Sequence, residues 1–422
     1  MTRNALLATI ERLVGGVGKI VIAIFVARFL GAEAQGVYAT LLSVWAVVAS
    51  WGTFGVEIAN NYYGARVSEN GGLSALLGNT LLFSLVTGGI AVACVLGLTH
   101  WTELLDIIPP DLRPALAVGA LLMTLSFPVG GVLFGLGEFK VHLIGVIINT
   151  VGFMAAAFAA LALNLLTVNI LCWLWVASLG GMVVYWTGVI LWKTRGRLRL
   201  SRDLFRNQIR YGLKGYVYNA FNVVNFRFDV LILGAFAPAA AVGYYSVAVS
   251  VAEGITYIPK GLTNVILTRV SSEGTHGTAI FQVLSTLLLA SALAIAVVSP
   301  VVVPAVFSDD FVRSVLPLQI MLPGTYLLSL GIVAAYTLFG LDRGGSASLA
   351  AAVCAGLTLA LDIALIPTLG IVGAALASSI AYSAFGVVAL FELADRDVSG
   401  ALSRLRPSLS MTWDVAGSLL RR

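Results

Sequence analysis

The sequence predicts an all-α polytopic membrane protein whose twelve transmembrane helices form two parallel repeats of six around a central cavity. Three observations predict this fold class: the composition, a series of apolar stretches, and motifs that recur in both halves. The chain of 422 residues is 59% hydrophobic and 11% charged, whereas soluble domains contain about 25% charged residues. Apolar runs of about 20 residues are typical of membrane spans. A soluble globular fold is therefore excluded.

Twelve stretches are long and apolar enough to be candidate spans. They lie near residues 9–30, 37–62, 76–98, 114–136, 141–163, 169–192, 211–235, 243–268, 279–305, 314–340, 346–366 and 370–391. We expect an N-lobe over 1–192, a basic connector over 193–210, a C-lobe over 211–391 and a tail over 392–422. None of the polar segments is long enough for a separate soluble domain.

The basic residues predict the orientation in the membrane. Most Lys and Arg lie in the N-terminus, in every second loop after it and in the tail, and seven of the 25 lie in the connector. Cytoplasmic loops carry such an excess. We therefore expect both termini on the cytoplasmic side of the cytoplasmic membrane of a bacterium or archaeon. The net charge of +5 then indicates orientation and contact with anionic membrane lipid, not binding of nucleic acid.

Two short motifs recur in the two halves of the chain. Residues 133–136 (LFGL) recur at 338–341, and Gly36-Val37-Tyr38 has a counterpart in Gly243-Tyr244-Tyr245. In each half the second motif opens the second span and LFGL ends the fourth. Because six spans are an even number, both repeats enter the membrane in the same direction. Such parallel repeats are typical of alternating-access transporters, whose substrate site lies between the lobes.

Polar residues recur along the seventh span at three- and four-residue steps, within an arc of roughly 80° on one helix face. They are Tyr211, Lys214, Tyr218, Asn222, Asn225 and Asp229. An ionised Lys or Asp at the centre of a bilayer costs about 2.5–3.5 kcal/mol on insertion scales. Such residues usually face the interior of a helix bundle or a water-filled cavity. The stripe therefore predicts a helix that lines a hydrophilic cavity.

Further polar residues predict the other walls of this cavity. The first span carries Arg12 and Lys19. The second and eighth spans, taken as continuous helices, each carry a stripe on one face: Ser50, Thr53, Glu57, Asn60 and Asn61 in the second, and Ser246, Glu253, Tyr257, Lys260 and Asn264 in the eighth. For any one of these residues the alternative is a buried ion pair or a side chain that snorkels to the interface.

The residue types predict two roles. Lys and Arg bind phosphate groups, and Tyr and Asn hydrogen-bond to hydroxyls. The candidates for pyrophosphate or sugar contacts are Arg12, Lys19, Lys214, Tyr218, Asn222, Asn225, Tyr257, Lys260 and Asn264. Buried acids bind Na⁺ or change protonation during transport, and the candidates for coupling to H⁺ or Na⁺ are Glu57, Asp229, Glu253 and Asp362. Asp362 fits a capped structural residue equally well, and Pro259, beside Lys260, fits a static kink as well as a hinge.

Nothing in the sequence indicates an enzyme, a metal site or a bound cofactor. His100, His142 and His276 are scattered, the three cysteines lie in apolar spans without paired spacing, and no phosphate-binding loop or nucleophile motif is present.

Several stretches resemble polysaccharide flippases of the multidrug/oligosaccharidyl-lipid/polysaccharide (MOP) exporter superfamily, the O-antigen flippases among them. The N-terminal run 15–44 is similar at Arg28, Leu30, Gly31, Gly36 and Tyr38. Residues 134–140 and 306–321 are similar as well, and residues 366–382 are similar at Pro367, Gly370, Gly373, Ala374 and Ala375. The resemblance implies two six-helix lobes, as in multidrug and toxic compound extrusion (MATE) transporters. It also implies flipping of a polyprenyl-pyrophosphate-linked oligosaccharide for surface polysaccharide assembly.

The partners implied are the lipid-linked oligosaccharide, membrane lipid and the polysaccharide polymerase or chain-length machinery. Lipid II flippases of the superfamily resemble fourteen-span proteins, which disfavours a peptidoglycan role. Three alternatives remain. A drug or organic-cation antiporter of the superfamily would have an acidic or apolar cavity, and a major-facilitator transporter would carry a basic motif after its second span. A polysaccharide polymerase or ligase would need a longer external loop than any here.

Overall fold

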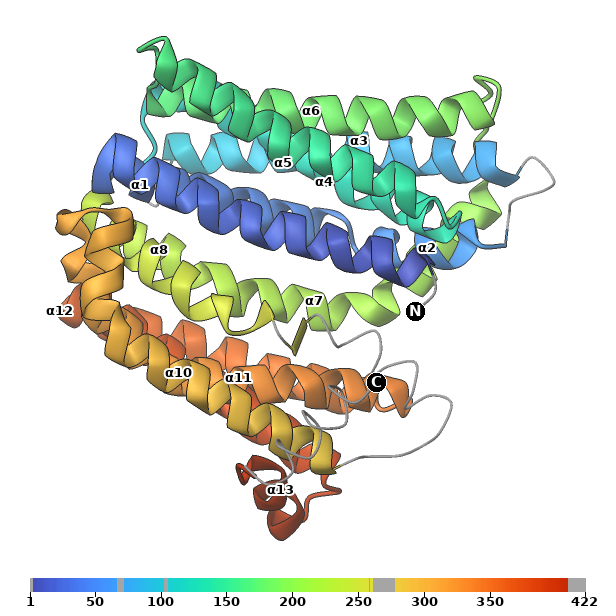
Figure 1. Ribbon diagram of the computed structural model, residues 1–422. Coiled ribbons are helices and arrows are strands. Elements are labelled where there is room, and N and C mark those ends of the chain that lie inside the picture. Colours follow the sequence, from blue (N-terminus) through green and yellow to red (C-terminus); the bar gives the residue numbers. More distant parts are fainter. Residues whose placement is uncertain (1–2, 67–71, 102–104, 258, 261–277, 409–422) are drawn as a thin grey trace. The chain divides into compact units, whose positions relative to one another are not determined.

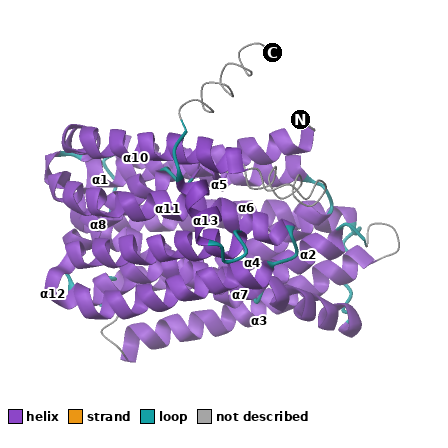
Figure 2. Cartoon of the chain, turned by 90° about the horizontal axis from the view of Figure 1, so that it is seen from below, coloured by secondary structure: helices purple, strands orange, loops and turns teal. Residues whose placement is uncertain are grey.

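The computed structural model of the chain is built of helices (Figures 1 and 2). It describes residues 3–66, 72–101, 105–257, 259–260 and 278–408, and within these ranges it leaves out the side chains of residues 3–14, 17, 101, 214 and 279. Contacts between Cα atoms divide the chain into two compact units. Unit 1 comprises residues 1–223 and 238–242, and unit 2 comprises residues 224–237 and 243–422.

Unit 1 is organised around one central helix, α4. Its helices are α1 (Arg3–Gly52), α2 (Val56–Gly64), α3 (Gly72–Trp101), the short η2 (Pro110–Leu112), α4 (Arg113–Gly135), α5 (Phe139–Ala162), α6 (Val168–Lys193) and the first part of α7 (Arg202–Phe236). α4 packs against α1, α2, α3 and α6. The fully buried Trp45 stacks on Trp175 with ring centroids 4.1 Å apart, and its Nε1 donates to the carbonyl oxygen of Leu116 at 2.8 Å. α1, α4 and α6 are thereby joined.

Unit 2 contains the rest of α7 and the helices that follow it. They are α8 (Ala239–Gly254), α10 (Thr278–Phe307), the short η3 (Asp309–Ser314), α11 (Val315–Gly340), α12 (Gly344–Leu393) and α13 (Val398–Leu405). α11 packs along α12 and also against α10. The predicted lobes of 1–192 and 211–391 differ from these units mainly at α7, whose first half packs within unit 1. The lobe boundaries stay predictions.

Described helices correspond to each of the twelve predicted spans, but residues 258 and 261–268 of the eighth span lie outside the described residues. Among the described residues, eight helices are long and apolar enough to cross a membrane. Two of them, α1 and α12, each include residues of two predicted spans. Their helical backbone is interrupted at Gly31 (φ 83°) and at Gly370 (φ 57°), close to where one predicted span gives way to the next. A positive φ favours glycine, which explains these two positions. The seventh and eighth spans correspond to α7 and α8, which are more polar or shorter. The predicted all-α polytopic fold is thus confirmed.

The second span of each repeat is broken within its described residues, so the assumption of a continuous helix behind the two stripes fails at residues 53–55 and 255–256. In unit 1, α1 ends at Gly52 and α2 begins at Val56, because Phe54 (φ 46°) and Gly55 (φ 73°) have left-handed backbone. In unit 2, α8 ends at Gly254 and a turn follows, in which Thr256 N donates to the carbonyl oxygen of Glu253 at 2.9 Å. A stripe drawn on an ideal helix therefore changes direction at each break.

The two LFGL motifs end their helices with the same backbone turn. After α4, Gly137 has a φ of 73° and Glu138 N donates to the carbonyl oxygen of Leu133 at 2.9 Å. After α11, Asp342 has a φ of 60° and Arg343 N donates to the carbonyl oxygen of Leu338 at 2.8 Å. This is the Schellman pattern, with a left-handed residue just past the helix end. The repeat predicted from four matching letters is therefore present in three dimensions.

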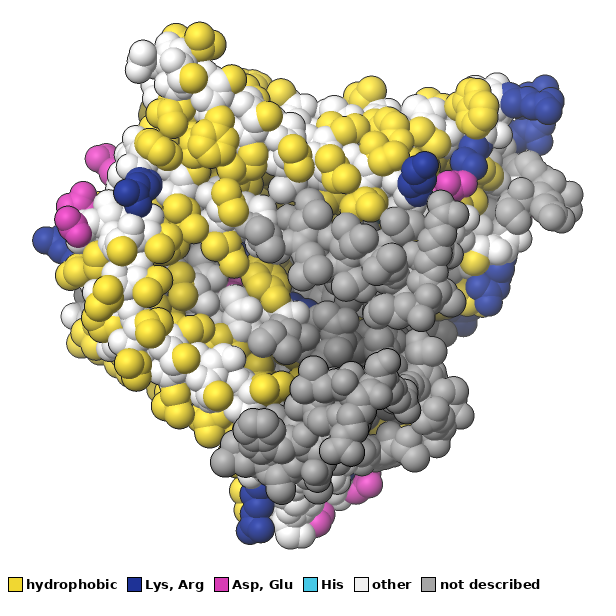
Figure 3. All heavy atoms as spheres, viewed as in Figure 1, with side chains coloured by type: hydrophobic (Ala, Val, Ile, Leu, Met, Phe, Trp, Pro, Cys, Tyr) yellow, Lys and Arg dark blue, Asp and Glu magenta, His cyan; other side chains and the backbone are white. Residues whose placement is uncertain are grey.

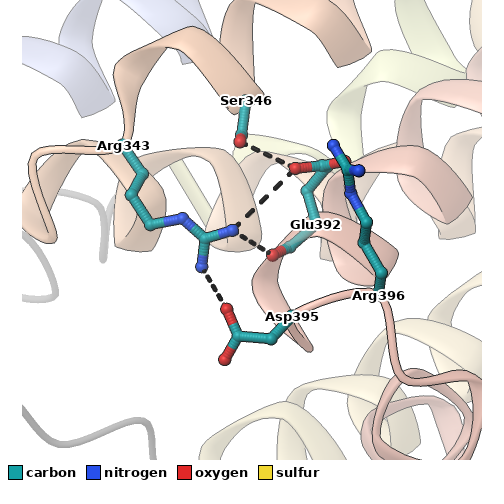
Figure 4. A network of polar contacts seen from close by, with 5 residues as sticks. All are labelled: Arg343, Ser346, Glu392, Asp395 and Arg396. Atoms are coloured by element: carbon teal, nitrogen blue, oxygen red, sulfur yellow. Dashed lines mark hydrogen bonds and ion pairs between the residues drawn. The ribbon is translucent and has the colours of Figure 1, made fainter.

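Each of these turns leads to an ion pair with the last long helix of its unit. In unit 1, Lys193 at the end of α6 lies 2.6 Å from Glu138. In unit 2, Arg343 donates to Asp395 at 2.7 Å and to the carbonyl oxygen of Glu392 at 2.9 Å (Figure 4). The carboxylate of Glu392 also accepts from Ser346 at 2.8 Å and from Arg396 at 3.1 Å. The first pair holds the end of α6 against the start of α5, and the second cluster holds the end of α12 against its own start, since α12 bends at Gly370.

A buried amide network fixes the beginning of α7 within unit 1. Gln208 donates to Asn60 at 2.7 Å and accepts from Asn79 at 3.2 Å, and Asn60 donates to Thr80 and to the carbonyl oxygen of Pro128, each at 2.9 Å. These residues come from α7, α2, α3 and α4. A buried network of this kind is stable only when its members find partners. It therefore defines where α7 starts against the rest of the unit.

Apolar side chains cover much of the face shown in Figure 3, and most of the charged side chains visible there lie toward helix ends. Val184 on α6 is 72% exposed, and Val297 and Val301 on α10 are 78% and 74% exposed. Exposed apolar helix faces of this extent are expected where lipid replaces water as the solvent.

Candidate functional site

The polar stripe of α7 is divided between the two units. Tyr218 and Asn222 belong to unit 1 and are half-buried, and Asn222 Nδ2 donates to the carbonyl oxygen of Tyr218 at 2.9 Å. Asn225 and Asp229 belong to unit 2 and are buried. Asn225 Nδ2 lies 3.4 Å from the carbonyl oxygen of Ala351 on α12. Lys214 lies on α7, but its side chain is outside the described residues. The side chains of the stripe thus lie in two different units.

The carboxylate of Asp229 is the centre of a hydrogen-bonded cluster inside unit 2. The hydroxyl of Tyr245 on α8 donates to its Oδ2 at 2.6 Å, and the backbone N–H of Val230 donates to its Oδ1 at 2.7 Å. Ser378 on α12 lies 2.9 Å from the Tyr245 hydroxyl and 3.4 Å from Asp229 Oδ2. Asp229, Tyr245 and Ser378 are each fully buried. Three helices therefore meet at one carboxylate.

A second buried carboxylate, Asp362, lies near the first. It is 0% exposed, and neither of its oxygens has a hydrogen-bond partner among the described residues. Its charge interacts with that of Asp229. One helical turn earlier on α12, the hydroxyl of Thr358 is also buried without a partner in the described part of the chain. A capped structural Asp would accept hydrogen bonds, so the capped role considered for Asp362 finds no support here.

An ionised carboxylate buried without a partner is costly. The cost falls if the group binds a cation or takes up a proton. Carboxylate and hydroxyl oxygens are also the ligands that hard cations prefer. The described residues contain no group of three or more His, Cys, Asp or Glu side chains that could hold a metal ion. Asp229 and Asp362 supply two carboxylates and Thr358 and Ser378 supply two hydroxyls for such chemistry, and all four side chains are buried.

The break after α8 brings together charged and aromatic side chains. Glu253 precedes the turn, is half-buried, and has one carboxylate oxygen, Oε1, without a partner among the described residues. Lys260 Nζ lies 5.2 Å from the ring centroid of Phe226 and 5.7 Å from that of Tyr257. Cations are attracted to the faces of aromatic rings at such distances. Lys260 also interacts electrostatically with Glu253 and with Arg227.

The break before α2 brings Glu57 to the start of a helix. Glu57 lies in the first turn of α2, where the helix dipole favours negative charge. Its Oε2 has no partner among the described residues. The same break packs directly on α7, since a Cβ added at Gly212 would lie 2.6 Å from the carbonyl oxygen of Gly55. Phe54 stacks on Tyr216 with ring centroids 5.5 Å apart. We call this contact the α2–α7 seam.

The structure gives less information about the remaining residues predicted to contact the substrate. Lys19 is exposed on α1. Arg12 lies on α1, but its side chain is outside the described residues, and Asn264 lies outside them altogether. Sequence reasoning missed Tyr245, Ser378 and Thr358. Tyr245 belongs to the repeated GYY motif, and Ser378 follows a run of small residues, so neither breaks an apolar pattern in the way that an Asp does.

Comparisons with solved structures identify the fold. The fold matches the structure described as lipid II flippase MurJ in an inward closed conformation, with a TM-score of 0.76 at 13% identity over 99% of this chain and 93% of that one. It also matches an inward-facing multidrug resistance MATE family transporter of the MOP superfamily, with a TM-score of 0.70 at 14% identity over 93% of this chain and 99% of that one. The fold is therefore that of the MATE-like MOP transporters.

A third match is a MOP superfamily transporter from Pyrococcus furiosus, described as having a binding pocket of reverse polarity. Its TM-score is 0.59 at 13% identity over 94% of this chain and 96% of that one. No curated protein sequence gives a significant match. The family described as polysaccharide biosynthesis protein matches residues 1–272. This chain belongs to that family and, with its many apolar helices, is a multi-pass membrane protein. The resemblance to a polysaccharide family drawn from the sequence is thus confirmed, and the fold is the one that MOP superfamily transporters share.

Proposed function

We propose that this protein flips a polyprenyl-pyrophosphate-linked oligosaccharide across the cytoplasmic membrane for surface polysaccharide assembly, such as that of an O-antigen. Transport follows alternating access and is driven by an H⁺ or Na⁺ gradient. The family match over residues 1–272 supports the polysaccharide pathway. The fold, shared with a lipid II flippase and with MATE transporters, supports transport rather than catalysis.

The observation that carries the ion coupling is the pair Asp229 and Asp362. Both carboxylates are fully buried, and Asp362 has no hydrogen-bond partner among the described residues. Two neighbouring buried charges of the same sign repel each other, so a bound cation or proton would stabilise the pair strongly. Tyr245 and Ser378 connect Asp229 to α8 and α12. Loading and release of the ion would then be linked to the packing of those helices. Glu57 and Glu253, each at a helix break, are the further coupling candidates.

The cations supply the chemistry for the pyrophosphate. Lys260 lies among aromatic rings at the break after α8, and Lys19 is exposed on α1. Lys214, Arg12 and Asn264 are proposed from the sequence alone. Tyr218, Asn222, Asn225 and Tyr257 are proposed as hydrogen-bonding groups for sugar hydroxyls.

We propose that both termini are cytoplasmic and that the connector contacts anionic lipid. Trp192 is 80% exposed and Leu200 is 67% exposed, and they flank Arg195, Arg197 and Arg199. Aromatic and basic side chains of this kind favour the interface of a membrane. The polysaccharide polymerase and chain-length machinery are the proposed protein partners.

Reconstitution into proteoliposomes tests the proposal. A polyprenyl-pyrophosphate carrying a fluorescent sugar is placed in the inner leaflet, and its appearance in the outer leaflet is followed under an imposed Na⁺ or H⁺ gradient. We expect flipping that responds to one gradient and that loses this response in Asp362→Asn and Asp229→Asn. Asp203→Asn, an exposed acid at the start of α7, is the matched control and should behave like wild type.

Two outcomes contradict the proposal in different ways. Flipping by the wild type that ignores both gradients, with unchanged Asp362→Asn, would remove the ion coupling. Gradient-driven export of an organic cation without movement of the lipid-linked sugar would instead favour the drug antiporter. Accumulation of lipid-linked sugar units on the inner leaflet of a deletion strain checks the same conclusion in cells.

A further inference from the structure

One end of the α2–α7 seam carries a compact group of aromatic and basic side chains, which we call the tyrosine stack: Tyr62, Tyr63, Arg66 and Tyr211. The rings of Tyr62 and Tyr211 stack with centroids 4.2 Å apart and an interplanar angle of 22°. The ring of Tyr63 meets both edge-on, at 5.1 and 6.0 Å. The guanidinium of Arg66 lies 3.6 Å from the ring centroid of Tyr62, and its Nη1 donates to the carbonyl oxygen of Tyr62 at 2.9 Å.

The stack is rigid but not buried. All three tyrosines are half-buried and Arg66 is exposed. The aromatic bodies pack on one another, and the backbone behind them is held by the close approach of Gly55 and Gly212 and by the ring contact of Phe54 with Tyr216. Fixed rings of this kind give contact area at low cost in conformational entropy. Such a surface is preorganised for a ligand.

The chemistry of the stack fits a sugar ring. A tyrosine offers an apolar face and a hydroxyl that both donates and accepts hydrogen bonds. A pyranose has apolar C–H faces and a rim of hydroxyls. Arg66 uses one N–H on Tyr62, and a guanidinium carries five N–H donors. The aromatic faces of the stack complement the apolar C–H faces of a sugar. Its phenol hydroxyls and guanidinium N–H groups complement the sugar hydroxyls.

The position of the stack fits a glycan bound at the start of transport. Tyr211 shares one face of α7 with Tyr218 and Asn222, which follow it at seven and eleven residues. All of these residues belong to unit 1 and lie within the part of the chain that matches the polysaccharide biosynthesis family. The seven cations of 193–210 directly precede Tyr211 in the chain, so the proposed topology puts the stack at the cytoplasmic end of unit 1.

We propose that the tyrosine stack is an entry subsite that binds a sugar ring of the lipid-linked oligosaccharide before it is flipped. This inference rests on the proposed function and adds a defined sugar contact to it. The stack contacts the sugar and not the pyrophosphate. Its contribution to binding is therefore the difference in affinity between a lipid pyrophosphate with a sugar and the same lipid pyrophosphate without one.

Binding of two synthetic probes to the full chain in lipid nanodiscs tests the inference. One probe is a short polyprenyl-pyrophosphate, and the other is the same compound carrying one glucose or one N-acetylglucosamine. We expect wild type to bind the sugar-bearing probe more tightly. Tyr62→Leu and Tyr211→Leu should reduce this preference by about 2- to 12-fold, since a lost aromatic contact is worth roughly 0.5–1.5 kcal/mol. Tyr62→Phe, which keeps the stack and loses one hydroxyl, should lose less.

Tyr185→Leu, a half-buried tyrosine on α6 outside the seam, is the matched control and should keep the full preference. Equal weakening of both probes by Tyr62→Leu would mean that the stack only supports the fold, and would overturn the inference. A wild-type protein that binds both probes equally, and still flips the lipid-linked sugar, would overturn it too while leaving the proposed function intact. A wild type that binds neither probe and flips nothing would refute the proposed function itself.

Discussion

Glu138 and Arg343 lie 205 positions apart and occupy the same place in the two repeats, with opposite charge. Each follows the left-handed residue that ends a helix at an LFGL motif. Each pairs with the far end of its unit's last long helix: Glu138 with Lys193, and Arg343 with Asp395 and Glu392. The repeat has therefore conserved a position for an ion pair without conserving the sign of the charge.

Exchanging the charges of the unit 1 pair should be tolerated. Glu138→Lys or Lys193→Glu alone places like charges together and should lower the free energy of unfolding by about 0.5–1 kcal/mol, because both side chains are about one-third exposed. The double exchange should recover most of that loss. Thermal unfolding of the purified proteins in detergent measures it. If the double variant lost as much unfolding free energy as the two single variants together, the two side chains would not form a stabilising ion pair.

Asp342→Gly should stabilise the protein. Asp342 has a φ of 60°, where a side chain costs roughly 1 kcal/mol relative to glycine. Its counterpart Gly137 has a φ of 73° and open space around it. Gly137→Ala should therefore destabilise by about 1 kcal/mol through backbone strain alone. Melting temperatures that shift in the same direction for both variants would contradict the proposed equivalence of the two turns.

Removing the Tyr245 hydroxyl should weaken unit 2. Tyr245→Phe deletes the 2.6 Å hydrogen bond to Asp229 and the 2.9 Å contact with Ser378. Loss of a buried hydrogen bond to a charged group costs about 1.5–3 kcal/mol. Tyr38 is the repeat counterpart of Tyr245 and is also buried, but its hydroxyl has no hydrogen bond to a described residue. Tyr38→Phe is thus the control and should cost less, as chemical denaturation can measure.

Lys260→Ala and Lys214→Ala should abolish flipping and leave membrane insertion and abundance unchanged. The cation at position 260 is held near Phe226 and Tyr257, so its loss removes a positive charge from the proposed pyrophosphate contact. Complementation of a flippase deletion, with immunoblots of membrane fractions, checks both parts. Lys140→Ala, an exposed lysine at the start of α5, is the control. Full complementation by both cavity variants would refute the cationic contact.

Gly212→Ala should disturb the α2–α7 seam. The added Cβ would lie 2.6 Å from the carbonyl oxygen of Gly55, so the two backbones must separate, at a cost of about 1–3 kcal/mol. Gly188→Ala on α6 meets nothing within 4 Å and should raise stability by up to about 1 kcal/mol, because alanine favours a helix more than glycine does. Unfolding curves compare the two. Equal stability of both variants would mean that the seam is loose.

Sequence patterns predicted the spans because a membrane helix needs a long apolar run wherever it packs. They also predicted the repeat, since LFGL closes two helices with the same turn. They failed at residues 53–55 and 255–256, where local left-handed residues or a turn break helices that were treated as continuous. Tyr245 and Ser378 escaped notice because hydroxyls are common in apolar helices, and only a partner such as Asp229 distinguishes them.

The sequence by itself determined the all-helical membrane class, the family and the presence of acids and cations that are costly within a membrane. Those properties depend on composition and on short motifs, which packing does not change. Only the tertiary structure decided that Asp229 is hydrogen-bonded while Asp362 has no partner in the described part of the chain, that Tyr62 stacks on Tyr211, and that Glu57 begins a helix. The residues of each pair are far apart in the chain or separated by a backbone break. Their distances follow from how the helices pack, which no periodicity along a single helix encodes.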